Sequence, residues 1–232
     1  MTTLNILSGG AAQGLVHGLT DAFKAQTGFR IDGQFGAVGI MADRLRASTP
    51  ADLVVLTRTL VARLADEHLV TSASIADIGQ IDTALAVRSG DPKVTVKTEA
   101  DLREVLRTAD AIFVPDTKAS TAGMHVAKVL DQLGIAYEVA SRLKIYPNGA
   151  TAMRELAAST AQRPIGCTQA TEIIATDGIV LSGTLPPGCE LVTMYTAGIT
   201  TRAAHPAEAR ALIALLAGAD QGELRRRVGF AG

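Results

Sequence analysis

The residues best suited to chemistry near the N-terminus form the turn Ser8, Gly9, Gly10 and Ala11, between an apolar strand and a stretch with helical spacing. The two glycines let a ligand approach the backbone, and the free N–H groups of a helix start favour negative charge by about 0.3–1 kcal/mol. The turn therefore predicts an anion-binding site. A plain strand-to-helix turn remains the alternative, because one glycine pair specifies no ligand.

Two further side chains could act on an acidic ligand. Arg58 follows the predicted strand 52–56, and its planar guanidinium favours bidentate binding of a carboxylate. His125 lies one turn into a predicted helix and is a candidate ligand or proton-transfer group, because imidazole titrates near neutral pH. A solvated arginine and an ordinary packed histidine are the alternatives.

Two later helix starts offer hydrogen-bond donors. Ser120 and Thr121 precede a predicted helix, where a hydroxyl either only caps the helix, which is worth about 1 kcal/mol, or also touches a ligand. Asn148, Gly149 and Ala150 begin another helix and are candidates for backbone donation to an anion.

The composition excludes several classes of protein. The chain has 232 residues, 47% of them hydrophobic, so it can bury a sizeable core in one domain or two lobes. A net charge of −1 and 3% aromatic residues provide no footprint for nucleic acid. No apolar run reaches the ~20 residues of a membrane span, and no histidine has a partner at metal-ligand spacing. Cys167 and Cys189 are either two buried thiols or one disulfide.

Strands and helices alternate along the first part of the chain. The predicted elements are a strand at 4–8, a helix to about residue 26, a strand at 29–35, the turn Gly36, Ala37 and Val38 before a second helix, and the strand 52–56 before a third. This alternation is typical of a parallel sheet covered by helices on both faces.

The same alternation restarts near residue 83. The predicted elements are strands at 84–87, 111–114 and 179–181, a loop at 182–188, an extended return segment at 191–200 and a helix from Pro206. Two α/β lobes are therefore predicted, 1–82 with 191–232 and 83–190, joined by two hinge crossovers. Since ligands bind beyond the carboxyl ends of strands in such sheets, we expect the ligand cleft between the lobes, with Tyr195 half-buried at the hinge or closing the cleft.

At this level of organisation the sequence resembles the type II periplasmic solute-binding proteins, and within them the molybdate-binding branch. The segments that carry the resemblance span nearly the whole chain: Thr27–Phe29, Phe35–Gly39, Pro50–Val54, Ala86–Pro92, Ala122–Lys128 and Gly166–Glu172. The resemblance implies a two-lobed α/β fold, each lobe a mostly parallel sheet flanked by helices, and a small anionic ligand.

The positions that hold molybdate in this branch are changed here. The resemblance implies a serine in the first turn, a serine in the second and a tyrosine late in the chain, where this sequence has Ala11, Val38 and Gln169. Each buried oxyanion oxygen left without a donor costs about 1–3 kcal/mol. We therefore expect a di- or tricarboxylate rather than molybdate, held with help from Ser8 and Arg58.

An enzyme is the second interpretation. Relatives of the molybdate-binding proteins include aconitate isomerases, which move a double bond in an unsaturated tricarboxylate. If the chain is such an isomerase, arginines and helix-start amides would hold the carboxylates, and Lys118 or His125 would move the proton. Lys118 would need to be buried for this role and is otherwise a solvated loop residue. We expect no cofactor and no metal in either case.

The N-terminus bears on location and partners. Residues 1–5 lack a basic segment followed by an apolar one, so the sequence as written predicts a cytoplasmic protein, or a periplasmic one if Met1 replaced an export signal. An ABC-transporter membrane component is an expected partner only if the protein is exported. No nucleic-acid partner and no membrane insertion are expected.

Overall fold

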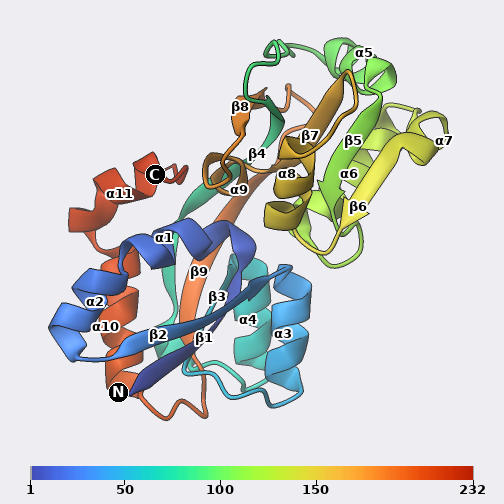
Figure 1. Cartoon of the computed structure of the whole chain (residues 1–232). Coiled ribbons are helices and arrows are strands. Elements are labelled where there is room, and N and C mark those ends of the chain that lie inside the picture. The colour runs from blue at the N-terminus through green and yellow to red at the C-terminus, as the bar shows by residue number, and fades with distance from the viewer. Residues whose placement is uncertain (1, 232) are drawn as a thin grey trace. The chain divides into compact units, whose positions relative to one another are not determined.

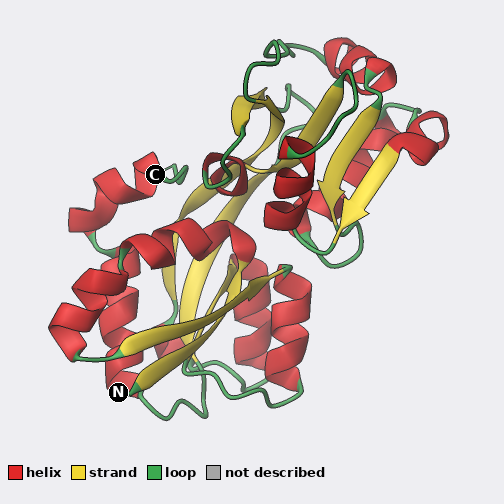
Figure 2. Ribbon diagram, viewed as in Figure 1, coloured by secondary structure: helices red, strands yellow, loops and turns green. Residues whose placement is uncertain are grey.

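The computed structural model describes residues 2–231 and divides the chain into two compact units. Unit 1 contains the chain up to Gln80 and from Thr193 onwards, and unit 2 is Ile81–Val192. The sequence placed these boundaries after residues 82 and 190, two residues away in each case. Figures 1 and 2 show that both units combine strands and helices, as expected for an α/β fold.

Unit 1 is built around a mostly parallel sheet. Its strands, in sheet order, are β2 (Arg30–Gly36), β1 (Thr3–Gly9), β3 (Leu53–Thr57) and β9 (Val192–Ile199). The first three are parallel, and β9 is antiparallel to β3. The register pairs Gly9 with Gly36 and Thr57 with Tyr195, so the carboxyl ends of the parallel strands meet at one edge. We call this the carboxyl edge of unit 1.

The helices of unit 1 cover this sheet. They are η1 (Gly10–Ala12), α1 (Gln13–Gly18), α2 (Thr20–Thr27), α3 (Val38–Arg46), α4 (Arg58–Asp66), η2 (Ser72–Ser74), α10 (Pro206–Ala217), η4 (Ala219–Gln221) and α11 (Gly222–Arg227). The single helix predicted to residue 26 is wrong, because α1 ends at Gly18 and α2 begins at Thr20. A Cβ at Gly18 would lie 3.1 Å from Leu224 of α11, so the glycine that interrupts the helix also lets α11 pack closely.

Unit 2 contains a mixed sheet. Its strands, in sheet order, are β8 (Ile179–Thr184), β4 (Ala76–Arg88), β7 (Pro164–Gln169), β5 (Ala111–Pro115) and β6 (Leu143–Tyr146). The first residues of β4, up to Gln80, belong to unit 1. Strands β7, β5 and β6 are parallel, whereas β4 is antiparallel to β7 and β8. The loop predicted from residue 182 is wrong over 182–184, because Gly183 and Thr184 pair with β4. Tertiary pairing overrides the local turn signal of Ser182 and Gly183.

The helices of unit 2 enclose an apolar core. They are α5 (Glu99–Thr108), α6 (Thr121–Gln132), α7 (Ala136–Val139), η3 (Ala140–Arg142), α8 (Gly149–Ala157) and α9 (Ala170–Ile174). Leu102 and Leu106 of α5 meet Val126 and Leu130 of α6 in this core, together with the free thiol of Cys167. Both cysteines are buried and unpaired, which resolves the two alternatives in favour of thiols.

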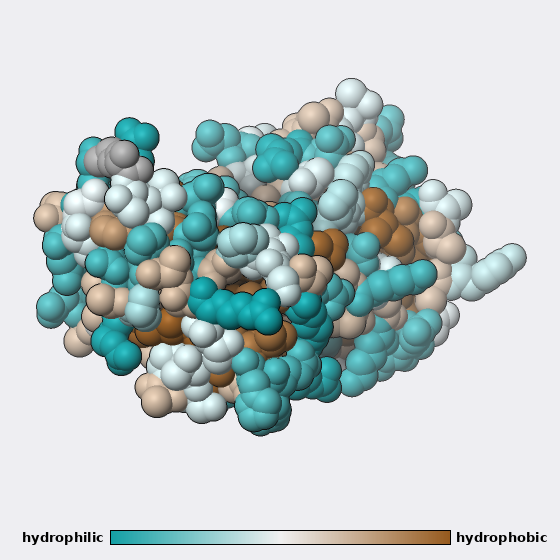
Figure 3. Space-filling view, turned by 90° about the horizontal axis from the view of Figure 1, so that it is seen from below, coloured by the Kyte–Doolittle hydropathy of each residue, from teal (hydrophilic) through white to brown (hydrophobic). Residues whose placement is uncertain are grey.

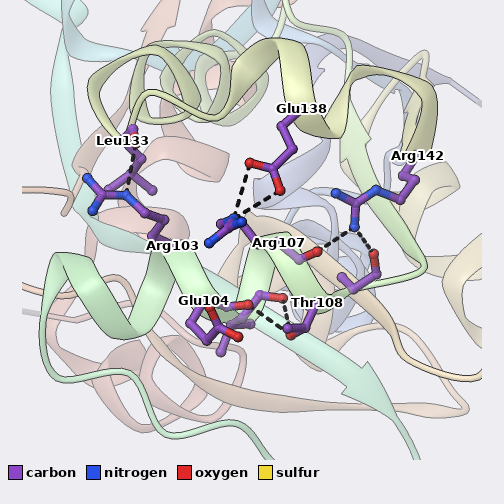
Figure 4. A network of polar contacts seen from close by, with 9 residues as sticks. Arg103, Glu104, Arg107, Thr108, Leu133, Glu138 and Arg142 are labelled. Atoms are coloured by element: carbon purple, nitrogen blue, oxygen red, sulfur yellow. Dashed lines mark hydrogen bonds and ion pairs between the residues drawn. The ribbon is translucent and has the colours of Figure 1, made fainter.

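Polar contacts fasten α5 to its neighbours (Figure 4). Arg103 donates from Nε to the Leu133 carbonyl at 2.9 Å, beyond the end of α6. Arg107 donates to both carboxylate oxygens of Glu138 on α7, at 2.9 and 3.1 Å. Arg142 donates to the Arg107 carbonyl at 2.7 Å. Arg103 and Arg142 thus satisfy carbonyls near helix ends, where intrahelical donors are missing, and Arg107 forms an ion pair.

The surface is mostly polar on the face seen in Figure 3, with smaller apolar areas between the polar ones. Within the described part of the chain, the large apolar side chains that are exposed are Ile40, Met124, Tyr137, Ile145, Ile174 and Val192. Among residues 2–231, no helix has the length and apolar character needed to cross a bilayer.

Candidate functional site

Helix starts follow the parallel strands directly at the carboxyl edge of unit 1. Gly10 begins η1 after β1, Val38 begins α3 just after β2, and Arg58 begins α4 after β3. The N-cap residues Gly9 and Ala37 have extended backbones and provide no side-chain cap. No hydroxyl or carboxylate of a cap residue therefore covers the first N–H groups of η1 and α3, which is the condition for donating to an anion.

Close packing explains the residues that replace hydroxyls at this edge. A Cβ on Gly9 would lie 2.7 Å from Val38 Cγ1 and 3.0 Å from the Tyr195 hydroxyl, so the glycine lets both side chains meet the backbone. Tyr195 is 2% exposed, and Ala11 and Val38 are buried as well. The prediction that Tyr195 is half-buried is therefore wrong. At Ala11 and Val38 the chain packs methyl groups where hydroxyl donors were expected from the resemblance.

Ser8 does not present its hydroxyl to an external anion in this structure. Its side chain is fully buried, and Oγ donates to the Gly9 carbonyl at 3.0 Å. The expectation that Ser8 assists ligand binding is thus unsupported by its geometry. Its hydroxyl satisfies a backbone acceptor at the strand end instead.

Arg58 is held by an acidic partner that the sequence did not indicate. Its Nε donates to Asp77 Oδ1 at 3.0 Å and its Nη2 donates to Asp77 Oδ2, a fork-to-fork contact. Thr196 Oγ1 also donates to Asp77 Oδ1, at 2.7 Å. The Arg58 guanidinium lowers the pKa of Asp77, and the Thr196 hydroxyl acts in the same direction. Because the Arg58 side chain is still 58% exposed, Asp77 orients it without enclosing it.

In unit 2 the loop after β5 is shaped by an aspartate. Asp116 Oδ1 accepts from the backbone N–H groups of Lys118 and Ala119, at 2.7 and 2.8 Å. Ser120 caps α6, although its Oγ lies 3.5 Å from Gly123 N, and Thr121 begins the helix half-buried. Lys118 is exposed, so the burial that its role as a base required is absent.

His125 is tied to the segment that precedes β9. Its Nε2 lies 2.8 Å from the Cys189 carbonyl, which requires the proton on Nε2. This contact joins α6 to the loop before the return strand and leaves Nδ1 as the ring nitrogen outside that bond. The geometry therefore gives His125 a structural role whether or not it also transfers protons.

A buried glutamate occupies the start of α8. Glu172 Oε2 accepts from Thr168 Oγ1 at 2.6 Å, and the carboxyl group lies against the backbone of Gly149. Glu172 is 7% exposed. Burial raises the pKa of Glu172, while the Thr168 hydroxyl and the backbone amides of Ala150, Gln169 and Gly149 act in the opposite direction. The start of α8 thus faces a buried carboxyl group, which the sequence did not anticipate.

The other predicted residues of unit 2 also lie where its parallel strands end and the next helices begin. Asn148 caps α8 by accepting from Thr151 N at 2.8 Å. Gln169 ends β7, is buried at the N-cap position of α9, and pairs in register with Thr83 of β4. The structure therefore groups the predicted residues into two sets, one at the strand ends of each unit. The prediction that both sets serve one ligand remains a prediction.

The cavities that stand out lie away from these sets. In unit 1 a cavity of about 90 Å³ is lined by Asn5, Asp52 and Thr200, beside the start of β3. In unit 2 a cavity of about 290 Å³ is lined by Val105, Arg163 and other residues near the starts of β5 and β7. Among the described residues no group of histidine, cysteine, aspartate and glutamate is arranged to hold a metal ion.

Glu172 and Asp77 are the polar residues that the sequence interpretation missed. Glu172 ends one of the segments that carry the family resemblance, and an acidic residue just after an apolar strand was the available signal. Asp77 had no such signal, because its relation to Arg58 depends on strand β4 passing beside the start of α4.

The comparisons with known proteins agree on the fold. The sequence model of a family described as bacterial extracellular solute-binding protein matches residues 4–231. A curated protein from Pseudomonas sp named aconitate isomerase is 28% identical over 231 residues, which covers 95% of this chain and 84% of that protein.

Solved structures of anion-binding proteins are similar over nearly the whole chain. The periplasmic molybdate-binding protein of Azotobacter vinelandii has a TM-score of 0.83 at 16% identity, covering 99% of both chains. A sulfate-binding protein of Mycobacterium tuberculosis has a TM-score of 0.77 at 19% identity, covering 99% of this chain and 86% of that one. At these identities the likeness shows the fold alone, and it confirms the predicted type II solute-binding fold of the molybdate-binding-protein kind.

Proposed function

We propose that this chain, which belongs to the family of bacterial extracellular solute-binding proteins, binds a small di- or tricarboxylate. The observation that carries the proposal is the carboxyl edge of unit 1, where Arg58 stands beside two helix starts without a side-chain cap. Backbone N–H groups and a guanidinium suit carboxylates. A tetrahedral oxyanion such as molybdate would bind poorly here, because Ala11 and Val38 provide no hydroxyl donors for its oxygens.

The pairing of Arg58 with Asp77 is compatible with this role. Asp77 accepts from Nε and Nη2, which is one edge of the guanidinium fork, and leaves the Nη1 donors to other acceptors. A ligand carboxylate could therefore bind the outer edge of a guanidinium that is already oriented. Preorganisation of this kind reduces the entropy lost when the ligand binds.

A thermal-shift screen tests the proposal. We expect trans-aconitate, citrate and smaller dicarboxylates to stabilise the protein, and molybdate, tungstate and sulfate to have little effect. Arg58→Lys should weaken carboxylate binding about tenfold or more, since it loses the planar fork. Stronger stabilisation by molybdate than by any carboxylate would contradict the proposal.

Arg46→Lys is the matched control. Arg46 also forms a fork-to-fork pair, with Glu67 at 2.8 Å for both contacts, but it lies in the last turn of α3. We expect Arg46→Lys to leave carboxylate affinity unchanged. Equal losses in the two variants would mean that Arg58 acts through general stability rather than through the ligand.

A second candidate function is an isomerase acting on an unsaturated tricarboxylate. The observation that favours it is the relative named aconitate isomerase, which matches 95% of this chain. The reaction would be an allylic proton shift, in which a base removes a proton beside the double bond, the double bond moves, and a proton returns at the far carbon. His125 is the candidate base through Nδ1, because its Nε2 is bonded to the Cys189 carbonyl.

Incubation with trans-aconitate in D2O separates binding from turnover. An isomerase should convert the compound and place deuterium on it, which NMR detects, and His125→Asn should slow the conversion. His17→Asn is the control, since His17 is exposed in α1 of unit 1. Stabilisation by trans-aconitate without conversion or deuterium would exclude the isomerase. Binding without turnover would fit delivery to an ABC-transporter membrane component by an exported protein, or sensing of the anion.

A further inference from the structure

The first turn of α8 begins against side chains of the protein itself. The backbone at Gly149 and Ala150 lies beside the Glu172 carboxyl group, and Thr151 donates to Asn148 Oδ1 at 2.8 Å. Ala152 donates to the Asn148 carbonyl at 3.0 Å. A helix start attracts anions because its first N–H groups lack intrahelical partners. Here the Glu172 carboxyl group occupies the space beside the first of these N–H groups, and Asn148 accepts from the next two.

The backbone at this point is fitted to the carboxyl group. A Cβ added to Gly149 would overlap Glu172 Oε2 and Thr168 Oγ1, so only glycine lets the helix start approach them. Thr168 lies near the end of β7, with its hydroxyl next to Gly149 of α8. This hydroxyl donates to Glu172 Oε2 at 2.6 Å. The carboxyl group thus sits between the Thr168 hydroxyl and the backbone at the start of α8, and a hydroxyl together with helix-start amides is a setting in which proteins commonly bind an external carboxylate.

We propose that Glu172 is a specificity-determining residue of unit 2, whose carboxyl group occupies the anion site at the start of α8 and keeps external oxyanions off its amides. The proposal deepens the proposed function, on which its meaning for ligand choice rests. A ligand that reaches this edge must use other donors, so small oxyanions that depend on the α8 amides are disfavoured. Polycarboxylates, which can be held by Arg58 and the unit 1 edge, are affected less.

Removing the carboxyl group should expose the site to an external anion. We expect Glu172→Ala to lower the melting temperature, and formate to raise it again by several degrees in a saturable way. Formate supplies the carboxylate that the variant lacks, and the Gly149, Ala150 and Thr168 donors remain to bind it. The wild type should not respond, because its own carboxyl group fills the site.

Glu172→Gln is the matched control, since its side-chain amide fills the same space and leaves no room for formate. Chloride at equal ionic strength controls for salt. The inference is overturned if folded Glu172→Ala gains no more stability from formate than from chloride, or if Glu172→Gln responds equally. If Glu172→Ala does not stay folded alone, its refolding yield from urea with formate or chloride is compared, and equal yields overturn the inference.

This experiment is independent of the proposed function. The formate response reports only on the start of α8, whereas the thermal-shift screen reports on polycarboxylates. If formate stabilises Glu172→Ala but no polycarboxylate stabilises the wild type, the proposed function is wrong and the role of Glu172 stands. If polycarboxylates stabilise the wild type but formate does not stabilise Glu172→Ala, Glu172 is not a specificity determinant and the proposed function stands.

Discussion

Single residues at the carboxyl edges show how packing and chemistry compete for the same positions. Gly9 is adjacent to Val38 and Tyr195, and Gly149 is adjacent to Thr168 and Glu172. In each case the absent side chain is what allows a larger neighbour to reach the backbone. These glycines therefore serve close approach, and neither has the positive φ that would demand glycine for backbone reasons.

Gly9→Ala is expected to destabilise the protein by about 1–3 kcal/mol, because the new Cβ would force Val38 or Tyr195 to move in a packed site. Urea unfolding of both proteins measures the difference. Gly183→Ala is the control, since a Cβ there meets nothing within 4 Å, and its effect should stay within about 0.5 kcal/mol. Equal costs at the two positions would show that the packing at Gly9 is not the cause.

Burial decides whether the two cysteines can act as nucleophiles. Cys167 lies in the core of unit 2, where burial raises the pKa of its thiol to about 12. Burial likewise raises the pKa of Cys189. Thiols that stay protonated and inaccessible are poor nucleophiles, so neither is a candidate for covalent chemistry.

At the scale of elements, the helix starts that follow the strands are of two kinds. In unit 1, η1 and α3 begin without side-chain caps, and Thr57 caps α4. In unit 2, Ser120 caps α6 and Asn148 caps α8, and α9 begins without a side-chain cap. The proposed function relies on the two uncapped starts in unit 1, because Arg58 belongs to the same edge.

The contact between α9 and α8 should make stability depend on pH. Burial raises the pKa of Glu172 above the 4.5 of an exposed glutamate, so the folded state holds this proton more tightly than the unfolded state. The associated stabilisation is complete below about pH 4.5 and is lost as the pH rises through the folded-state pKa.

Glu172→Gln removes this dependence. The free energy of unfolding of the wild type minus that of the variant is expected to fall as the pH rises above 4.5. Urea unfolding of both proteins over a series of pH values measures the difference. A difference that is flat or rises with pH would contradict the direction of the pKa shift.

At the scale of the whole molecule, hydrogen exchange can show which strand ends a bound ligand protects. We expect a bound polycarboxylate to slow amide hydrogen exchange in peptides covering residues 8–12 and 36–40 of unit 1 and 116–124 of unit 2. Peptides covering 148–152 should be unaffected, because the buried Glu172 carboxyl group already lies against the Gly149 backbone and Thr151 donates to Asn148. Protection confined to unit 1 would contradict a ligand shared by both units.

Molybdate serves as the control in that exchange experiment, since it should protect none of these peptides in the wild type. A general stiffening of the protein by salt would instead slow exchange throughout, including at peptides far from the strand ends such as α10.

The amino-acid sequence by itself determined the alternation of strands and helices, because apolar periodicity and glycine turns are local signals. It also located the helix starts after β1, β2 and β5, and the loss of hydroxyls at Ala11 and Val38, from which a ligand other than molybdate was expected. Those inferences needed only residue types and their order along the chain.

Only the tertiary structure decided which of those groups are available. Arg58 and Asp77 lie 19 residues apart and Gly149 and Glu172 come from separate helices, so their contacts depend on how the strands are ordered in each sheet. Ser8 has the residue type of a ligand donor, but in the folded chain its hydroxyl donates to the Gly9 carbonyl. A hydrogen-bond donor serves one acceptor at a time, and the sequence shows the donors without showing which acceptor each one meets.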